Sequence, residues 1–180
     1  MSNGEIDKIE DVFRNSTSVD ELFDSFQEAL KYAFKDIELY KILLSNSALS
    51  SDEIKLFTQK LIKVFPQDAF NLLMWAASIF ESCVDDRYGP ENAFLYYSNA
   101  IQVQPASHKP LLAILGLYNY DAEVLSNQKV IDVIVSNIQA VHLKSKVYFA
   151  LAEHYKKNGN YVIASKYFEM GEKAAERENK

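Results

Sequence analysis

Apolar residues recur every three or four positions along most of the chain. Leu22, Phe26 and Leu30 follow this spacing near the N-terminus, and Ile54, Phe57, Leu61 and Phe65 repeat it further on. The same spacing returns around Leu72, Ala93, Leu111 and Val130. It places apolar side chains on one face of an α-helix, and no stretch alternates as a strand hairpin would. The pattern predicts an all-α fold of nine or ten helices.

Polar and turn-forming residues stand where the predicted helices would begin and end. The 5 glycines and 4 prolines lie between the periodic segments, which indicates short turns. A Ser followed three residues later by Glu matches a capping box, and Pro after Gly favours a helix start. The predicted starts are Ser18 with Glu21, Ser50 with Glu53, Gly89-Pro90, Ser107 and Ser126.

The segment from Ser145 to Glu178 carries a repeat signature. Its first predicted helix has large residues and one small residue at Tyr148, Leu151, Ala152 and Tyr155. A tight turn, Asn158-Gly159-Asn160-Tyr161, comes next, and Ala164, Phe168 and Gly171 follow on a second helix. This segment resembles a tetratricopeptide repeat (TPR), with Gly171 standing where the family has its second alanine. In that family the small residues let two helices approach while the large ones fill the gap between them.

Looser copies of the repeat precede this segment. One lies between Pro66 and Pro105, with a five-residue insertion in the loop Ser82 to Glu91, and a degenerate one runs from Leu111 to Val141. The resemblance implies one helical repeat domain over 1–180, with less regular helices in 1–67 and TPR-like repeats in 68–178. Such repeats stack into a short right-handed solenoid of helical hairpins. An ordinary helical bundle is the alternative.

The resemblance also implies a function, since the first helix of each repeat lines a groove that accepts a peptide or helix. An adaptor or assembly factor that binds another protein is therefore expected. In the family register the groove-facing residues are Phe70, Leu73, Ala77 and Phe80, then Lys109, Leu112, Gly116 and Asn119, then Lys146, Phe149, Glu153 and Lys156. This groove suits an amphipathic segment with an acidic end near Lys146 and Lys156.

Other interpretations of these positions stay open. Phe70, Leu73 and Phe80 fit equally well as core residues covered by the N-terminal helices, and the lysines as solvated faces. TPR domains that clamp the C-terminal carboxylate of chaperones use lysine and asparagine at set positions. Phe70, Leu73 and Ala77 stand at those positions here, so that role is not expected.

Charge and composition narrow the partner class. The chain has 19 basic and 25 acidic residues, a net charge of −6, which disfavours direct contact with nucleic acid or an anionic membrane surface. Cys83 is the sole cysteine, and the most apolar stretch, Ala69 to Phe80, is too short to span a bilayer. We expect a cytoplasmic protein, with the nucleus as a second possibility.

Residues for catalysis are not grouped in the sequence. His108, His142 and His154 are far apart, and no phosphate-binding loop, nucleophile elbow or paired cysteine motif occurs. Asp85 and Asp86 are too few oxygen ligands for a cation site. The sequence thus predicts a non-enzyme with no metal and no cofactor. The alternatives are a structural subunit of a homo-oligomer or larger complex, which includes RNA-processing assemblies, and a non-obvious enzyme.

Overall fold

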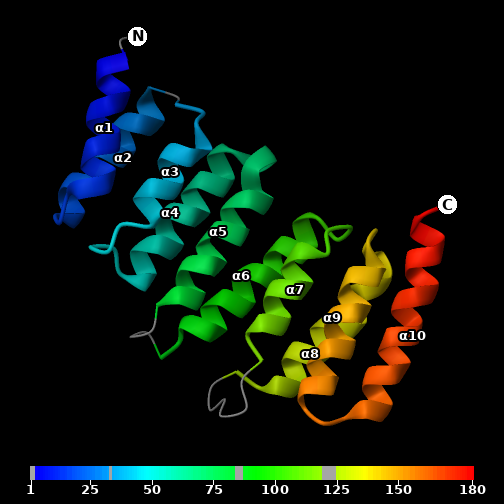
Figure 1. The fold of residues 1–180 in the computed structure, drawn as a ribbon. Helices are drawn as coiled ribbons and strands as arrows, with labels where there is room; N and C mark the ends of the chain where they lie inside the picture. The colour runs from blue at the N-terminus through cyan, green and yellow to red at the C-terminus, as the bar shows by residue number, and fades with distance from the viewer. Residues whose placement is uncertain (1–2, 33, 84–86, 119–124) are drawn as a thin grey trace. The chain divides into compact units, whose positions relative to one another are not determined.

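The computed structural model describes residues 3–32, 34–83, 87–118 and 125–180. These ranges contain ten α-helices, two short 3₁₀ helices and no strand (Figure 1). The all-α class and the number of helices are confirmed. The solenoid arrangement is compatible with these helices and stays a prediction.

The chain divides into two compact units, residues 1–80 and 81–180, with the boundary inside one helix. The first unit contains α1 (Asn3–Asn15), α2 (Val19–Lys31), α3 (Ile37–Leu44), α4 (Ser51–Val64), η1 (Pro66–Asp68) and most of α5 (Ala69–Ser82). The second contains α6 (Gly89–Val103), α7 (Lys109–Gly116), α8 (Asn127–Asn137), η2 (Ile138–Ala140), α9 (Lys144–Lys157) and α10 (Tyr161–Glu178). A single repeat domain over 1–180 stays a prediction.

The capping box that the sequence predicts at Ser50 is present. The Glu53 amide donates to Ser50 Oγ (3.4 Å), and the Ser50 amide donates to Glu53 Oε2 (2.6 Å). At Ser18 only half of the box forms, because Glu21 accepts from Ser16 Oγ (2.5 Å) instead of from the Ser18 amide.

The other predicted helix starts agree with the structure to within one residue, but not every predicted side-chain cap hydrogen bond forms. Helix α6 begins at Gly89 as predicted, with Pro90 in its first turn. Ser126 is the N-cap residue of α8, but its side chain makes no cap hydrogen bond. The N-cap position of α7 is His108, one residue later than predicted, and Ser107 Oγ accepts from the Lys109 amide (3.4 Å).

Removing the Ser50 hydroxyl should destabilise α4. Ser50→Ala leaves the first amides of the helix without their side-chain acceptor, which costs about 1 kcal/mol. The expected result is a lower urea midpoint for residues 1–80, followed through the fluorescence of Trp75, the chain's one tryptophan. Ser47→Ala is the matched control, because Ser47 is exposed. Equal midpoints for the two variants would contradict the capping role.

Tyr40 on α3 is the centre of the aromatic core of the first unit. Its side chain is fully buried, with ring centroids 5.4 Å from Phe65, 6.1 Å from Phe26 and 6.5 Å from Phe13. Its hydroxyl donates to the carbonyl of Phe34 (2.9 Å). Rings from α1, from α2 and from the junction between α4 and η1 therefore pack against one side chain, and the hydroxyl of that side chain has a hydrogen-bond partner.

Helix α10 buries little of its surface. Only Ala164 and Gly171 of its 18 residues are buried, while α9 buries Val147, Tyr148 and Leu151 among others. Among the described elements, α9 is the main packing partner of α10 (Figure 1). The small residues predicted for a close helix pair are therefore where the resemblance places them. Much of the surface of α10 stays open.

Candidate protein-binding groove

Helices α9 and α10 are joined by a tight turn that fixes their antiparallel pairing. Gly159 has φ = 74°, in the left-handed region that glycine enters without steric cost. Asn160 follows as the N-cap of α10, and its side chain accepts from the Ile163 amide (3.3 Å). The Asn-Gly-Asn sequence thus ends one helix and starts the next.

An open apolar groove of about 600 Å³ lies between the two helices. Phe149 on α9 and Phe168 on α10 pair across it, with ring centroids 5.5 Å apart. Tyr161 is 68% exposed and Phe168 50% exposed, although both are large aromatic residues. The lining residues are Phe149, Ala152, Glu153, Lys156, Tyr161, Ala164, Ser165 and Phe168.

Phe168 departs from the role that the repeat resemblance gives it. The family's large aromatic at this position fills the space between packed helices, but here half of the ring remains in contact with solvent. The physical reason is that, in the part of the chain described, only α9 packs extensively on α10. An aromatic surface that this packing does not cover is available to another molecule.

Gly171 lets the Phe149 ring, which lines the groove, approach α10 closely. A Cβ atom at this position would lie 2.7 Å from Cε1 and 2.8 Å from Cδ1 of Phe149, well inside van der Waals contact. The hydrogen of glycine therefore lets the Phe149 ring lie directly on the backbone of α10. The contact with Phe149 explains why glycine stands at position 171, where the repeat family has alanine.

The charges along the groove are unequal. Glu153 is balanced by Lys157 at 3.9 Å, an exposed pair of little energetic weight. Lys156 on the rim and Lys146 further along α9 are exposed, and neither has an ion-pair partner within 4 Å among the described residues. Helices α9 and α10 together carry seven basic and five acidic residues. The unpaired charge beside the groove is positive.

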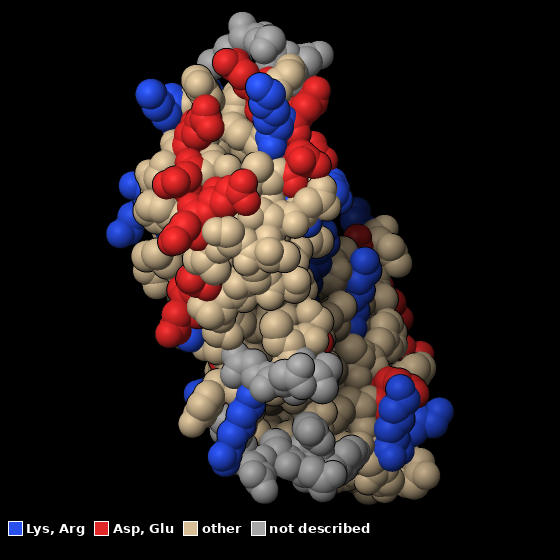
Figure 2. All heavy atoms as spheres, turned by 90° about the vertical axis from the view of Figure 1, so that its left-hand side faces the viewer, with Lys and Arg blue, Asp and Glu red and all other residues tan. Residues whose placement is uncertain are grey.

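The net acidity of the chain lies elsewhere. Helices α1 and α2 hold eight acidic and three basic residues, and Figure 2 shows acidic side chains gathered on the face where the N-terminal helices lie. Residues 81–180 carry 12 acidic and 11 basic residues, so they are almost neutral. The net charge of −6 therefore says little about ligands of the second unit.

The structure brings together only part of the predicted groove. Phe149, Glu153 and Lys156 line one cavity, and Lys146 lies on the same helix outside it. Leu73 and Phe80 are buried, which corrects their assignment as groove residues and favours the core alternative. Ala77 is also buried, Phe70 and Leu112 are half-buried, Lys109 and Gly116 are exposed, and Asn119 lies outside the described residues.

Five lining residues were not predicted as groove residues from the sequence. Ala152 lies on α9, and the other four, Tyr161, Ala164, Ser165 and Phe168, come from α10, whereas the resemblance assigns the groove to first helices. A usable signal was the apolar pair Tyr161-Val162 at the start of α10, directly after the turn. Both residues are largely exposed.

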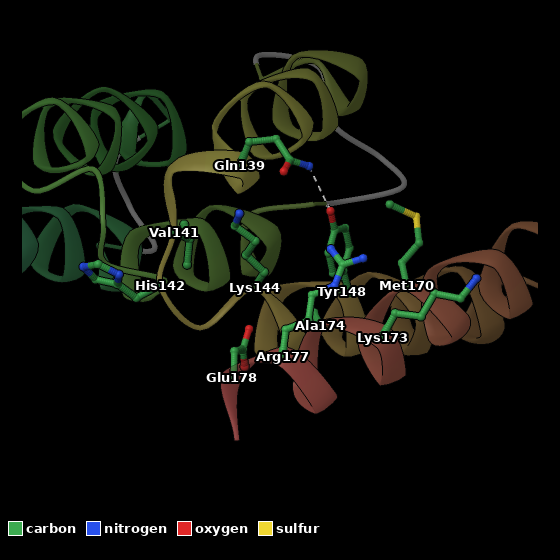
Figure 3. Close-up of a pocket in the computed structure, with 10 residues that line it drawn as sticks. All are labelled: Gln139, Val141, His142, Lys144, Tyr148, Met170, Lys173, Ala174, Arg177 and Glu178. Carbon is green, nitrogen blue, oxygen red and sulfur yellow. Dashed lines mark hydrogen bonds between the residues drawn. The ribbon is translucent and has the colours of Figure 1, made fainter. Parts of the chain in front are cut away.

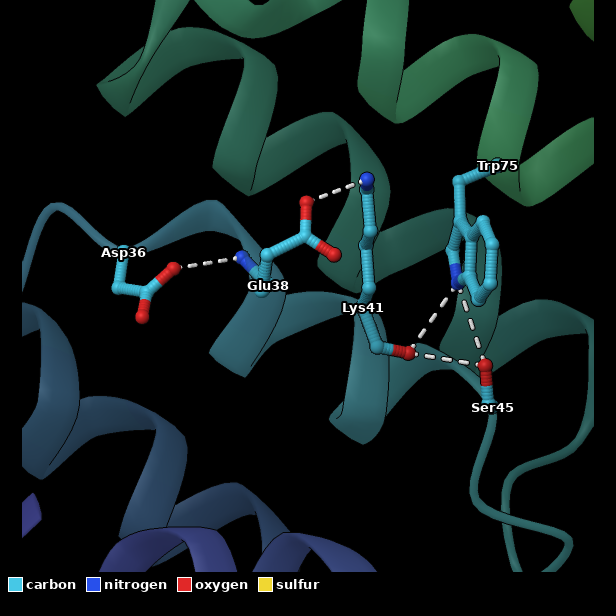
Figure 4. Close-up of polar contacts among 5 residues, drawn as sticks. All are labelled: Asp36, Glu38, Lys41, Ser45 and Trp75. Carbon is cyan, nitrogen blue, oxygen red and sulfur yellow. Dashed lines mark hydrogen bonds and ion pairs between the residues drawn. The ribbon is translucent and has the colours of Figure 1, made fainter.

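Trp75 of α5 packs against α3 in the first unit. Its Nε1 donates to the carbonyl of Lys41 and to Ser45 Oγ, both at 3.2 Å, and the Lys41 ammonium lies 5.3 Å from the ring centroid (Figure 4). Glu38 holds that ammonium at 2.6 Å, and Asp36 caps the helix that carries both residues. The indole is 37% exposed and links α5 to α3, which is a packing role.

The polar candidates of the sequence make local contacts. The His154 ring lies 4.3 Å from the Tyr118 ring, and burial, with help from Lys157, lowers the pKa of this histidine. Burial likewise lowers the pKa of His108, with smaller contributions from Lys146 and Lys109. The neutral form of both histidines therefore predominates at pH 7.

The predicted acidic loop is only partly described. Glu81 accepts from the Tyr97 hydroxyl (2.7 Å), while Asp85 and Asp86 lie outside the described residues. Cys83 is half-buried. In the described ranges, no three His, Cys, Asp or Glu side chains are grouped as a metal site requires. None of the described helices combines the length and apolarity needed to cross a membrane.

The N-terminus of α9 is capped from a distance by Glu178, near the end of α10. Its carboxylate accepts from the amide and from the hydroxyl of Ser145. Partial burial would raise the pKa of Glu178, but these hydrogen bonds, the Lys144 amide and the Lys144 charge together lower it. The ionised carboxylate thus ties the two ends of the hairpin together.

This tie predicts a pH dependence. The pKa of Glu178 is lower in the folded state than in the unfolded one, so its stabilisation is present above the unfolded value and is lost as pH falls through the folded one. Wild type should therefore lose stability below about pH 5. Glu178→Gln should show a smaller loss in thermal melts between pH 7 and pH 3. Equal pH dependence in both proteins would exclude the tie.

The fold and the groove together define an all-α protein with a solvent-open aromatic groove on a helical hairpin. Comparison of the chain with protein-family models, curated proteins and solved structures gave no match. The TPR resemblance therefore rests on the residues quoted above and stays a prediction.

Proposed function

We propose that this protein is an adaptor that binds an amphipathic helix of another protein in the groove between α9 and α10. The observation that carries the proposal is the contact between half-buried Phe149 and exposed Phe168 in an open groove of about 600 Å³. Exposed aromatic patches of this kind are a mark of interaction sites.

A helical occupant is favoured over an extended one. The polar lining residues of the groove are Glu153, Lys156, Tyr161 and Ser165, and the others are apolar. An extended peptide would bring backbone amides and carbonyls that this surface cannot satisfy, whereas a helix satisfies its own. An amphipathic helix also packs its ridge of side chains into the groove between two helices.

An acidic partner is favoured over a basic one. Lys146 and Lys156 have no carboxylate partner within 4 Å among the described residues, while Glu153 already has Lys157. Acidic residues beside the apolar face of the partner helix would complement these lysines. Such charges also discriminate between partners, because basic residues of a wrong partner would be repelled by these lysines.

The repeat architecture is part of the same proposal. In the second unit α6 packs on α7, α7 on α8 and α9, and α9 on α10. This order of contacts is that of stacked hairpins, which supports a TPR-like arrangement of residues 81–180. An adaptor is located in the same compartment as its partner, and we expect that compartment to be the cytoplasm.

The test uses two synthetic amphipathic helical peptides with the same apolar face, one flanked by glutamate and the other by lysine. Calorimetric titration of the full chain should show the glutamate peptide binding at least about tenfold more tightly. Phe168→Ser should weaken it by about tenfold or more, since a central aromatic contact is lost. Leu95→Ser is the matched control, because Leu95 on α6 is 52% exposed, similar to Phe168.

Two outcomes would contradict the proposal. One is undiminished binding to a folded Phe168→Ser variant, which would place the site elsewhere. The other is absence of peptide binding together with a dimer, seen by sedimentation, that Phe168→Ser disrupts. That result would favour the alternative of a self-associating structural subunit.

A further inference from the structure

A second cavity, of about 490 Å³, is lined by residues of η2, α9, α10 and the segment before α9 (Figure 3). On α10 its lining residues Lys173 and Arg177 point away from the side that carries Ala164 and Phe168, as the 100° rotation per residue requires. The two cavities share no lining residue. This pocket is therefore independent of the apolar groove.

The pocket is electropositive. Lys144, Lys173 and Arg177 line it together with a single carboxylate, that of Glu178, and these four side chains have a summed formal charge of +2. Neither Lys173 nor Arg177 has an ion-pair partner within 4 Å in the described ranges. Both oxygens of Glu178 are engaged by Ser145. Lys173 and Arg177 are thus available to an anion from outside.

The rest of the wall adds a hydrogen-bond donor and an apolar surface. The buried Tyr148 accepts from Gln139 Nε2 at 3.0 Å through its hydroxyl oxygen, so its own proton remains to be donated. Val141, Met170 and Ala174 supply apolar wall. A complementary ligand has two negative charges, several acceptor oxygens and a carbon body beside them.

We propose that this pocket binds a phosphomonoester, which carries a charge of about −1.5 to −2 at pH 7 and has three strongly accepting oxygens. A single carboxylate would compensate only half of the formal charge of the pocket. The forked guanidinium of Arg177 can donate two parallel hydrogen bonds to phosphate oxygens, and Lys173 and Tyr148 can donate to the rest. This site goes beyond the helix-binding function and does not depend on it.

The experiment is a titration of the ¹⁵N-labelled full chain with phenyl phosphate at low salt, followed by amide chemical shifts. Saturable shifts are expected in residues 139–148 and 170–178, which surround the pocket. Arg177→Gln and Lys173→Gln should each weaken binding by about tenfold, the usual effect of losing a charge-assisted hydrogen bond. Lys166→Gln, on the same helix but outside the pocket, should change it less than about twofold.

Glu178→Gln supplies a test of opposite sign. It removes the one negative charge of the pocket while glutamine keeps an acceptor for the Ser145 amide, so phenyl phosphate should bind more tightly. Phe168→Ser should leave the titration unchanged, which separates this site from the groove. The phosphomonoester could belong to a phosphorylated protein or to a free small molecule. Tighter binding of a phosphotyrosine peptide than of phenyl phosphate identifies the protein, and the reverse identifies the small molecule.

Three results would overturn the proposal. The first is that neither phosphomonoester shifts the pocket resonances of a chain whose spectrum shows it folded. The second is that Lys166→Gln weakens binding as much as Arg177→Gln, which would mean unspecific charge attraction. The third is that phenol shifts the same resonances with equal affinity, because the phosphate group would then contribute nothing.

Discussion

Replacing Tyr40 by alanine is expected to lower the free energy of unfolding of residues 1–80 by about 3 to 5 kcal/mol. The side chain is fully buried among the rings of Phe13, Phe26 and Phe65, which come from different elements, so no single element can move in to fill the space. This is a large fraction of the stability of an ordinary domain. We expect the first unit to be largely unfolded at 37 °C.

The measurement is urea unfolding followed through Trp75, whose indole contacts Lys41, the residue after Tyr40. Tyr40→Phe separates the ring from the hydroxyl, because it leaves only the Phe34 carbonyl without its partner and should cost about 1 to 3 kcal/mol. Leu56→Ala is the exposed control, with an expected change below about 0.5 kcal/mol. A Tyr40→Ala midpoint close to that of Leu56→Ala would contradict the assignment of Tyr40 as the core centre.

The helical spacing of apolar residues was sufficient to predict the fold class. Leu22 and Phe26, four residues apart, are both buried on one face of α2, as an amphipathic helix requires. The hydrogen bonds at helix ends were harder to predict. Either the Ser16 hydroxyl or the Ser18 amide could donate to the Glu21 carboxylate, and the sequence does not show that the Ser16 hydroxyl does so. Local patterns therefore predict elements well and their hydrogen bonds less well.

The site was predicted in part because exposure depends on what packs across a helix. Phe80 and Phe149 both occupy groove-facing positions in the repeat register, yet Phe80 is buried and Phe149 lines an open groove. The groove-facing residues of the two segments recur at the same intervals along the chain. The packing of other elements on each helix is therefore what distinguishes a buried position from an open one. The basic pocket brings together Gln139 of η2 and Glu178 at the end of α10, which are 39 residues apart (178 − 139), so no local motif marks it.

Gly171→Leu is expected to have the largest effect on the hairpin. A side chain at this position must displace the Phe149 ring, because even a Cβ atom would lie 2.7 Å from it. Overpacking of this kind costs about 1 to 3 kcal/mol, although leaving glycine recovers up to about 1 kcal/mol of helix propensity. The displaced ring and the new side chain would also fill the groove.

The variant is therefore expected to change both the stability of the hairpin and the affinity for the peptide. Gly171→Leu should lower the melting temperature and weaken the glutamate-flanked helix peptide by about tenfold or more, whereas Gly171→Ala should be closer to wild type in both because its methyl group displaces the ring least. Lys166→Leu on the exposed side of α10 is the control for added apolar surface. If Gly171→Leu bound the peptide as tightly as wild type, the contact between Phe149 and α10 would not shape the binding surface. The groove would then have to lie along another face of the hairpin.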